Sequence, residues 1–455
     1  MPKPTRRKFL QNSAIAAAVT PMIQASFAQD SPNERINVAV VGFHSRGMDH
    51  IQALAKIPNV RITALCDVDE RLFPHAVSEV ERLSGHRPIT EVDMRRLLER
   101  DDVDAVSLAT PDYWHALQTI WACQAGKDVY VEKPIALTVV EGRRMVQAAR
   151  KYNRIVQAGT QLRSDPDIRA AVRMLNEGKM GQVYRARTDF SKPRANIGHT
   201  KEASIPPGVH WDLFLGPTPY RPYTVNRFHY GWHHFWDTAP SEVGNIGVHT
   251  LDVCRWGMGK QVHPKKIHCT GGMFVWDSDQ ETPNVQLGTI EYEDGKLIDF
   301  EVNTLFAPQP NGGNVFYTSE GYVTDRGGRG AWKAMRGNVV LRDKPHPSGV
   351  DERVMNAGAS WVNYEPGPAI DSAGESKANH FENFIQAMRS RKVEDLYCDI
   401  LEGHMSTCLA QLSTISYRLG RKLEFNPDTE TFLDDAEADQ YLTRPYRGYV
   451  LPDQL

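Results

Sequence analysis

The sequence predicts an α/β protein with two domains, in which a doubly wound parallel sheet is followed by an α+β domain with a large, mainly antiparallel open sheet. Three observations lead to this prediction. Short β-branched runs alternate with helical patterns from residue 36 to about residue 160, as in successive strand–helix–strand units. Beyond residue 262, long strand-like segments follow one another without intervening helices. The chain has 455 residues, more than one domain usually contains.

The first domain is expected to consist of short buried strands separated by helices. Its strand segments share an apolar, β-branched run that ends at a turn, and they span residues 36–42, 60–67, 104–111, 128–134 and 154–161. Its helical segments share apolar residues at a helical period, and they begin at Gly47 and span residues 115–126 and 138–153. Strands and helices at this spacing predict parallel pairing.

The second domain is expected to mix helices with an antiparallel sheet. The long strand-like segments are 265–276, 285–302 and 314–324, and Asp294-Gly295 inside the second of them is typical of a hairpin turn. Helices are expected over 167–178, 241–253, 380–392 and 399–420. Between the first two helices lies a stretch rich in proline and aromatic residues, 192–238.

Composition narrows the class of function. Hydrophobic residues make up 41% of the chain and charged residues 24%, which is ordinary for a soluble globular protein. The net charge of -3 does not indicate a nucleic-acid partner. The six cysteines include no C-x-x-C pair, which argues against a zinc knuckle or a redox dithiol. We interpret the cysteines as small buried side chains.

Residues 1–28 are predicted to be a cleaved export signal. A basic segment, TRRKFLQ (5–11), precedes an apolar run and the small-x-small site Ser26-Phe27-Ala28. The paired Arg6-Arg7 resembles a twin-arginine signal, which would carry the folded protein to the periplasm. An ordinary secretory signal or a membrane anchor is the alternative. No later run of about 18 apolar residues predicts a further membrane span.

The turn Gly42-Phe43-His44-Ser45-Arg46-Gly47 is predicted to bind a dinucleotide. It joins the first strand to a helix, where backbone N–H groups and a helix N-terminus meet a pyrophosphate. The G-x-G-x-x-G pattern is incomplete, because His44 stands at the middle glycine. Asp67 ends the second strand, where a carboxylate grips the ribose 2′-hydroxyl and repels a 2′-phosphate. NAD is therefore favoured, with NADP as the alternative.

Lys133 is the candidate catalytic residue of the first domain. Val131-Glu132-Lys133-Pro134 ends a strand at the carboxyl edge of the sheet, where ligands bind in such folds. A lysine whose pKa is lowered there could hold a substrate hydroxyl and help to move its proton. The alternative is a solvated lysine at a strand end.

These segments together resemble the Gfo/Idh/MocA oxidoreductase family, to which glucose–fructose oxidoreductase and inositol dehydrogenases belong. The resemblance covers essentially the whole chain after the signal. It rests on GFHSRG (42–47), the pair CD (66–67), ATPDYWH (109–115), VEKP (131–134), GTQ (159–161) and N-x-x-x-H (245–249). The later runs WDLFLGP (211–217), NRFHYGWHHFWD (226–237) and GNIGVHTLD (244–252) look like a secreted, twin-arginine-exported branch. The division implied is a signal, residues 1–28, an NAD-binding Rossmann domain, residues 29–158, and a substrate-binding and oligomerisation domain, residues 159–455.

The resemblance implies roles for individual residues. Lys133 matches a lysine that contacts substrate and nicotinamide, and His249 matches a histidine that takes or gives the hydroxyl proton. Asn245 stands where the family usually has an aspartate, so we expect His249 to be a weaker base than in those enzymes. The i, i+4 spacing would set Asn245 and His249 on one helix face. The expected cofactor-binding residues are Gly42, His44, Ser45, Arg46, Gly47, Asp67, Thr110, Pro111, His115, Glu132, Lys133 and Gln161.

A dense aromatic cluster is expected to form a sugar-binding wall. Its members are His229, Tyr230, His233, His234 and Trp236. Aromatic faces would stack on a pyranose ring while the imidazoles bind hydroxyls, and some of these groups could share in the proton relay. The alternative is a structural cluster that packs a loop. A metal site formed by Glu242, His249, Asp252 and the histidines of 229–234 is the weaker alternative, because the spacing H-x3-HH is not H-E-x-x-H, and no metal is predicted.

The predicted function is an exported NAD(P)-dependent oxidoreductase that moves hydride between a sugar or polyol hydroxyl and a tightly bound nicotinamide. The alternative is an NAD-dependent glycoside hydrolase acting by oxidation, elimination and hydration. Lys133 argues against this alternative, since comparable NAD-dependent glycosidases lack that lysine. A non-catalytic sugar-binding protein is a third hypothesis. A homodimer or homotetramer is expected, because an open sheet leaves a face to bury.

Overall fold

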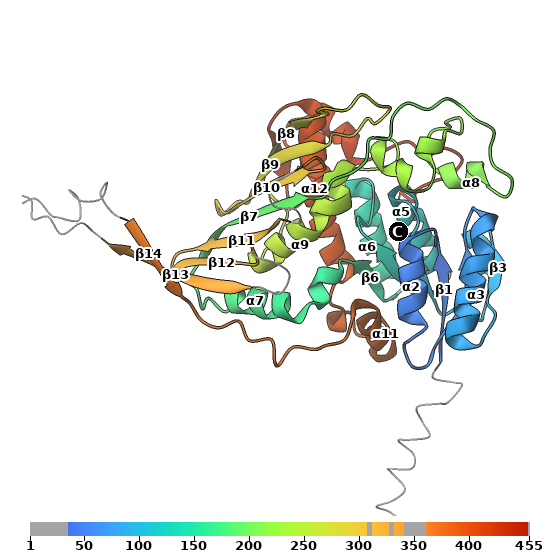
Figure 1. Cartoon of the computed structure of the whole chain (residues 1–455), viewed down its shortest axis with the longest axis horizontal. Helices are drawn as coiled ribbons and strands as arrows, with labels where there is room; N and C mark the ends of the chain where they lie inside the picture. Colours follow the sequence, from blue (N-terminus) through green and yellow to red (C-terminus); the bar gives the residue numbers. More distant parts are fainter. Residues whose placement is uncertain (1–34, 307–311, 327–331, 341–360, 454–455) are drawn as a thin grey trace, which may run out of the picture.

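The computed structural model describes residues 35–306, 312–326, 332–340 and 361–453. The predicted export signal lies outside these residues. Within them the first domain and the second sheet lie at opposite ends of the molecule, with the long helix α12 (Ile400–Leu419) between them (Figure 1). None of the helices in the described part of the chain is long and apolar enough to cross a membrane.

The first sheet confirms the predicted doubly wound arrangement. Its strand order is β3-β2-β1-β4-β5-β6, and every neighbouring pair is parallel. The strands are β1 (Ile36–Val41), β2 (Val60–Cys66), β3 (Ile89–Glu91), β4 (Ala105–Leu108), β5 (Asp128–Glu132) and β6 (Val156–Gly159). The helices are α2 (Arg46–Leu54), α3 (Phe73–Ser84), α4 (Met94–Leu98), α5 (Asp112–Gln124) and α6 (Val139–Lys151). The order reverses between β1 and β4, which opens a crevice at the carboxyl ends of the strands.

The second sheet has ten strands and is mainly antiparallel, as predicted. Its order is β14-β13-β12-β11-β7-β10-β9-β8-β15-β16, and β7 and β10 are its parallel pair. The strands are β7 (Val183–Ser191), β8 (Lys266–Gly272), β9 (Val285–Glu291), β10 (Leu297–Asn303), β11 (Gly313–Thr318), β12 (Gly321–Thr324), β13 (Lys333–Val340), β14 (Trp361–Pro366), β15 (Leu423–Asn426) and β16 (Thr431–Phe432). The predicted hairpin joins β9 to β10, and Gly295 adopts the positive φ of +76° that this turn requires.

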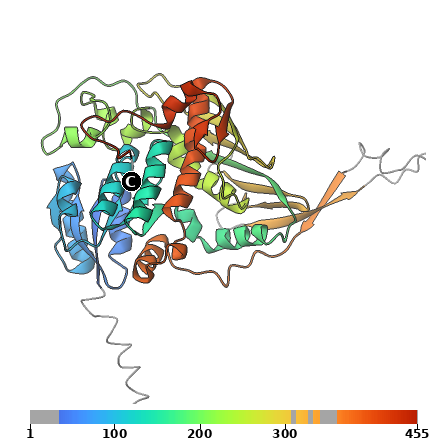
Figure 2. The same cartoon turned by 180° about the vertical axis from the view of Figure 1, so that it is seen from behind.

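Helices cover one face of the second sheet. They are α7 (Pro166–Asn176), α9 (Val248–Gly257) and α12, while α8 (Trp211–Leu215) and α13 (Ala436–Asp439) lie outside this layer. Seen from both sides, α9 and α12 lie between the sheet and the first domain (Figures 1 and 2). The core between helices and sheet contains Leu251, Ile298 and Phe316, all fully buried. This layer sets the start of α9 against the carboxyl edge of the first sheet.

One late helix packs on the first domain. Helix α11 (His380–Ser390) begins with the capping box of Asn379 and Glu382. Its residues Phe381, Phe384 and Ile385 are buried with Val38 and Val40 of β1. The domain boundary between residues 158 and 159 stays a prediction. Helix α11 belongs to the second domain by its place in the sequence but packs on the first domain, which we did not expect.

Candidate functional site

One cavity of about 660 Å³ lies at the carboxyl ends of the first sheet and extends to the second domain. Nearly all of the expected site residues line it, and they are Gly42, His44, Ser45, Arg46, Asp67, Thr110, Pro111, His115, Glu132, Lys133, Gln161, His229, Tyr230, His233, Asn245 and His249. The structure therefore brings together residues that lie more than 200 positions apart in the sequence. Three expected residues do not line it: Gly47, His234 and Trp236.

The turn before α2 is shaped by its two glycines. Gly42 has a φ of +77°, and a Cβ there would lie 2.9 Å from the backbone oxygen of Ala109. A Cβ on Gly47 would lie 1.8 Å from the backbone oxygen of Gly42. Gly47 therefore acts by close packing beneath the turn. The N-terminus of α2 then faces the cavity, as a pyrophosphate site requires.

Asp67 occupies the place expected for the carboxylate that grips the adenosine ribose. Its two oxygens accept hydrogen bonds from the backbone N–H of Phe43 (2.8 Å) and of Asp69 (3.0 Å). Burial raises the pKa of Asp67 to about 6, although these N–H groups oppose the rise. The nearby cation Arg71 is held by Asp69 through two bonds of 2.7 Å. The arginine is thus engaged elsewhere, and the surroundings of Asp67 do not favour a 2′-phosphate.

Replacing Asp67 with serine is expected to lower the preference for NAD over NADP by at least about tenfold. The substitution removes the carboxylate that repels a 2′-phosphate and that accepts the ribose hydroxyls, and one lost charged hydrogen bond corresponds to roughly tenfold or more in affinity. Dissociation constants for NADH and NADPH, measured by nucleotide fluorescence, test this. An unchanged ratio of the two constants would show that Asp67 does not face the ribose.

Glu132 is the anchor of the strand end that carries Lys133. Its Oε1 accepts hydrogen bonds from Arg46 Nε (2.9 Å) and Gln161 Nε2 (2.8 Å), and His50 Nε2 lies 3.0 Å away. Burial would raise the pKa of Glu132, but the hydrogen bond with His50 and the charge of Arg46 outweigh it and hold that pKa well below its usual range. Glu132 is thus a fixed negative charge beside Lys133.

Lys133 reaches across the cavity to the second domain. Its Nζ donates to the backbone oxygen of Asn245 at 2.7 Å and lies 3.3 Å from Asn245 Oδ1. Burial lowers the pKa of Lys133, while the carboxylates of Glu132, Asp112 and Glu242 oppose the drop. The lysine is therefore not a solvated strand-end residue: it joins the two domains at the cavity floor.

The helix carrying Asn245 and His249 differs from the regular helix that we expected. Residues Val243–Gly247 form a π-helix, and the α-helix α9 begins only at Val248. A π-helix has hydrogen bonds between residues i and i+5, one residue further apart than in an α-helix, and such turns often occur at functional sites. Here the backbone oxygen of Asn245 accepts the hydrogen bond from Lys133 Nζ. Both side chains line the cavity, so the expected grouping is present, although the two residues lie in a π-helix and at the start of α9 and not in one regular α-helix.

His249 faces the cavity as a neutral imidazole. Burial, and then the positive charge of Lys133, lower the pKa of His249 to about 3. Its Nδ1 is buried and has no hydrogen-bond partner among the described residues. An uncharged imidazole is the form that can accept a proton from a substrate hydroxyl.

The loop at Thr110 is tied to the segment after Lys133 by His115. One ring nitrogen of His115 lies 2.8 Å from the backbone oxygen of Pro134, and the other lies 2.8 Å from that of Thr110. Thr110 Oγ1 donates to Gln118 at 2.6 Å. His115 therefore positions the loop that follows Lys133. Thr110 and Pro111 belong to the other loop, after β4, and both line the cavity.

Two further residues that line the cavity, Asp112 and Arg194, were missed in the sequence. Asp112 lines the cavity, and its Oδ2 is buried without a partner among the described residues. Burial raises the pKa of Asp112 well above its usual value, against the charge of Lys133. Glu242 accepts from Arg194 Nε (3.1 Å) and from Asn245 Nδ2 (3.1 Å). Asp112 directly follows the Thr110-Pro111 pair, which was the available signal, whereas nothing local marked Arg194.

The expected aromatic wall is only partly in place. Tyr230 and His233 line the cavity with rings stacked 4.2 Å apart between centroids. His234 is buried behind them, where its backbone oxygen accepts from Glu281 N at 2.9 Å. Trp236 lies under Arg418 in a separate cavity. The prediction that His234 and Trp236 belong to this wall was wrong: His234, the last residue of the short helix η5 (His229–His234), is buried outside the cavity lining, and Trp236 lies beyond that helix in the separate cavity.

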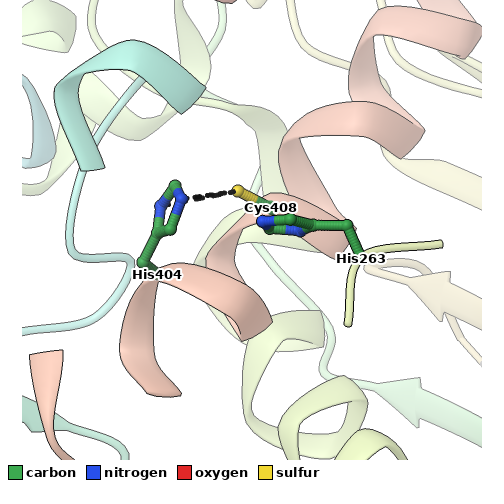
Figure 3. Close-up of side chains that lie close together, drawn as sticks. All are labelled: His263, His404 and Cys408. Atoms are coloured by element: carbon green, nitrogen blue, oxygen red, sulfur yellow. Dashed lines mark hydrogen bonds between the residues drawn. The ribbon is translucent and has the colours of Figure 1, made fainter. Parts of the chain in front are cut away.

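A second cluster of potential metal ligands lies away from this cavity. His263, His404 and Cys408 offer atoms within 4.8 Å of one another (Figure 3). Both histidines donate to Glu430 Oε1, from Nε2 at 2.6 and 2.9 Å, and Arg143 binds the same carboxylate. The carboxylate accepts three donors, so the cluster is a buried ion-pair network that ties α6 to α12. It gives no support for a metal site.

The comparisons with known proteins match this two-part arrangement. The model described as the oxidoreductase family, NAD-binding Rossmann fold, matches residues 36–160. The model for the C-terminal alpha/beta domain of the same family matches residues 176–303 and 368–450. The chain belongs to the Gfo/Idh/MocA oxidoreductase family. Its first domain is therefore an NAD-binding Rossmann domain, with the Gly42–Gly47 turn and Asp67 at the positions described above.

Curated relatives of this Gfo/Idh/MocA protein match over part of their length. Glycosyl hydrolase family 109 protein 1 of Shewanella sp. (strain ANA-3) is 27% identical over 33% of this chain and 34% of its own. The family 109 protein of Shewanella pealeana is 27% identical over 40% of this chain and 44% of its own. The chain thus spans a third to less than half of the curated relatives it matches.

Solved structures share the fold over most of both chains. The WlbA dehydrogenase from Bordetella pertussis, in complex with NADH and UDP-GlcNAcA, has a TM-score of 0.60 at 18% identity, covering 86% of this chain and 99% of its own. Levoglucosan dehydrogenase in complex with NADH has a TM-score of 0.61 at 17% identity, with the same coverage. At these identities the likeness establishes the fold of the Gfo/Idh/MocA chain.

Proposed function

We propose that the protein is an exported NAD-dependent oxidoreductase that transfers hydride between a sugar or polyol hydroxyl and a tightly bound nicotinamide. One observation carries the proposal: a single cavity holds the dinucleotide features Gly42 and Asp67 at one end and Lys133, Asn245 and His249 at the other. The two relatives with NADH in their solved structures, and the sugar derivative bound to one of them, support it.

Bound NAD would supply the hydride acceptor at its nicotinamide ring. The chain's own residues would handle the proton. Neutral His249 takes the proton of the substrate hydroxyl, while hydride leaves the carbon that carries this hydroxyl, so an alcohol becomes a carbonyl compound. The Lys133 ammonium, fixed against Asn245, holds the oxygen on which negative charge develops. Asn245 orients Lys133 through its backbone and side chain.

The aromatic wall beside these residues, where the hydroxyl of Tyr230 accepts a hydrogen bond from Asn245 Nδ2 at 3.2 Å, suits a carbohydrate. The stacked rings of Tyr230 and His233 combine aromatic surface with a polar hydroxyl and polar ring nitrogens. Trp232 stacks on His233 with ring centroids 3.5 Å apart. Polar hydroxyls and apolar C–H faces alternate on a sugar ring, so such a surface binds both. Tyr230 is 42% exposed, which leaves it accessible to a ligand.

Replacing Asn245 with aspartate is expected to move the pH optimum of sugar oxidation to higher pH. A carboxylate at this position, next to Lys133 and in the same cavity as His249, would favour the charged form of both, so their pKa values would rise and the base form of His249 would appear at higher pH. The acid limb of kcat/KM against pH measures this shift. A limb at the same pH in both proteins would show that His249 does not control the rate.

Export is proposed on the sequence of residues 1–28. Substituting lysine for both Arg6 and Arg7 should leave the protein in the cytoplasm if a twin-arginine route carries it, as followed by cell fractionation. In a compartment without free NAD, the cofactor would have to stay bound and be recycled by a second substrate. Periplasmic arrival of the doubly substituted chain would contradict this route.

An NAD-dependent glycosidase is the second candidate, favoured by the glycosyl hydrolase family 109 relatives. In that chemistry the sugar hydroxyl is oxidised only transiently, the glycosidic bond is eliminated, and water is added. A screen of free sugars and nitrophenyl glycosides on the purified protein separates the two. A stable rise in bound NADH with a free sugar supports the dehydrogenase, and nitrophenol release without net cofactor reduction supports the glycosidase.

Self-association is proposed for the uncovered face of the second sheet. Leu287 of β9 is 42% exposed there, and the neighbouring strand β10 carries Asp299, which forms an ion pair with Arg185 of β7. A mixed apolar and charged face of this kind suits a symmetric contact with a second copy. Light scattering of the purified protein should give the mass of a dimer or tetramer, and a monomeric mass at micromolar concentration would exclude the proposal.

A further inference from the structure

The long segment between β7 and the π-helix returns to the first domain beside the nucleotide end of the cavity. The backbone N–H of Glu70 donates to Gly208 O, and that of His210 donates to Val68 O, both at 2.8 Å. Asp69 and Val209 are paired between these two bonds as in an antiparallel sheet. The second domain is thus joined to the residues that directly follow Asp67, the expected ribose contact.

The same segment is fixed to the first domain on the other flank of the cavity. The hydroxyl of Tyr113 donates to Phe214 O at 2.6 Å, and Trp114 Nε1 donates to Leu213 O at 3.0 Å. Leu213, Phe214 and Trp114 all line the cavity. Residues 208–229 therefore span the nucleotide end from the tip of β2 to helix α5.

A histidine pair lies where this segment meets the glycine turn. The rings of His229 and His44 stack with centroids 3.8 Å apart, and His229 Nε2 lies 3.0 Å from Asp69 Oδ2. His229 has a φ of +49°, which a residue with a side chain adopts when its surroundings hold it there. Burial lowers the pKa of His229 to about 4, so two uncharged rings can stack at neutral pH. His44 is the residue that interrupts the glycine pattern.

We propose that residues 208–229 form a strap that retains the dinucleotide, and that the His44–His229 contact closes it beside the pyrophosphate-binding turn. This inference rests on the proposed NAD-dependent function and extends it, since it assigns cofactor retention to named residues of the second domain. Release of the cofactor then requires the strap contacts with residues 68–70 to open. His44 stands in place of glycine because its ring is one half of the closure.

The strap is tested by the rate at which bound NADH leaves the full-length protein, followed by fluorescence after mixing with excess NAD. His229→Ala removes the ring stack and the bond to Asp69, and we expect release at least about tenfold faster. Tyr220→Ala is the matched control, because Tyr220 lies in the same segment, is 62% exposed and does not line the cavity. Release from that variant should match the unsubstituted protein.

A second variant covers the case in which His229→Ala fails to fold. Asp69 and Val209 form a non-hydrogen-bonded antiparallel pair, in which side chains lie close enough for a disulfide. In Asp69→Cys/Val209→Cys protein, oxidised NADH-loaded samples should release nucleotide at least about tenfold more slowly than the same samples after reduction. Equal rates in both states, or release from His229→Ala within twofold of the control, would overturn the strap. A protein that binds no nucleotide at all would instead overturn the proposed function.

Discussion

Lys133→Met is expected to lower kcat for sugar oxidation by about 10²- to 10⁴-fold, the usual range for loss of a positioned proton-transfer or charge-stabilising group. Methionine keeps the unbranched side chain up to the ε position but removes the ammonium that bridges to Asn245 at 2.7 Å. The nucleotide end of the cavity, around Gly42 and Asp67, is left intact. Steady-state kinetics and the NADH dissociation constant of the variant together measure the effect.

The matched control for this variant is Lys56→Met, which removes an exposed lysine at the end of α2. It should have the activity of the unsubstituted protein. Lys133→Met should bind NADH within about threefold of the control, since the lysine acts on substrate and not on the adenosine half. Activity within tenfold of the control would show that Lys133 is only a structural bridge between the domains.

Asp252→Ala is expected to lower the free energy of unfolding by about 3–5 kcal/mol, the cost typical of removing one partner of a buried ion pair. Asp252 is fully buried and binds Arg163 Nε at 2.9 Å, and it also accepts from Ser406 at 2.6 Å. Among the residues that the structure describes, alanine would leave the buried Arg163 guanidinium with Glu402 as its one remaining ionic partner. Chemical denaturation followed by tryptophan fluorescence measures the loss.

Glu99→Ala provides the comparison for Asp252→Ala, because it breaks the exposed pair between Arg96 and Glu99. A surface pair contributes about 0–1 kcal/mol. A similar small loss for both variants would mean that Arg163 finds compensation elsewhere. The alternative metal site involving Asp252 is also weakened by this pairing, since both oxygens of Asp252 are engaged by Arg163.

The parallel sheet of the first domain could be predicted because its buried strands are short continuous apolar runs separated by helical patterns. The carboxyl-edge location of Asp67 and Lys133 followed from the ends of those runs. The first residues of the helices were predicted less accurately than the strands. The helix that we expected from residue 115 begins at Asp112, because Pro111 leads directly into its first turn. That shift concealed Asp112, which the structure places in the cavity.

The parts that escaped prediction depend on contacts between distant segments. The π-helix at Val243–Gly247 has no periodic signal, and its role becomes visible only when Lys133 meets the Asn245 backbone oxygen. Trp236 seemed to be a sugar platform by residue type, but its partner Arg418 lies about 180 positions later. The strap was present in the sequence only as a proline- and aromatic-rich stretch, because its order comes from pairing with residues 68–70.

Denaturing the purified full-length protein and identifying the nucleotide it releases tests whether one cavity serves both cofactor and sugar. We predict close to one equivalent of NAD or NADH per chain, with a change in its redox state when the native protein is first incubated with a sugar or polyol that it oxidises. Lys133→Met should release the same amount without that change. Protein that carries no nucleotide and binds none on addition would contradict the proposed function.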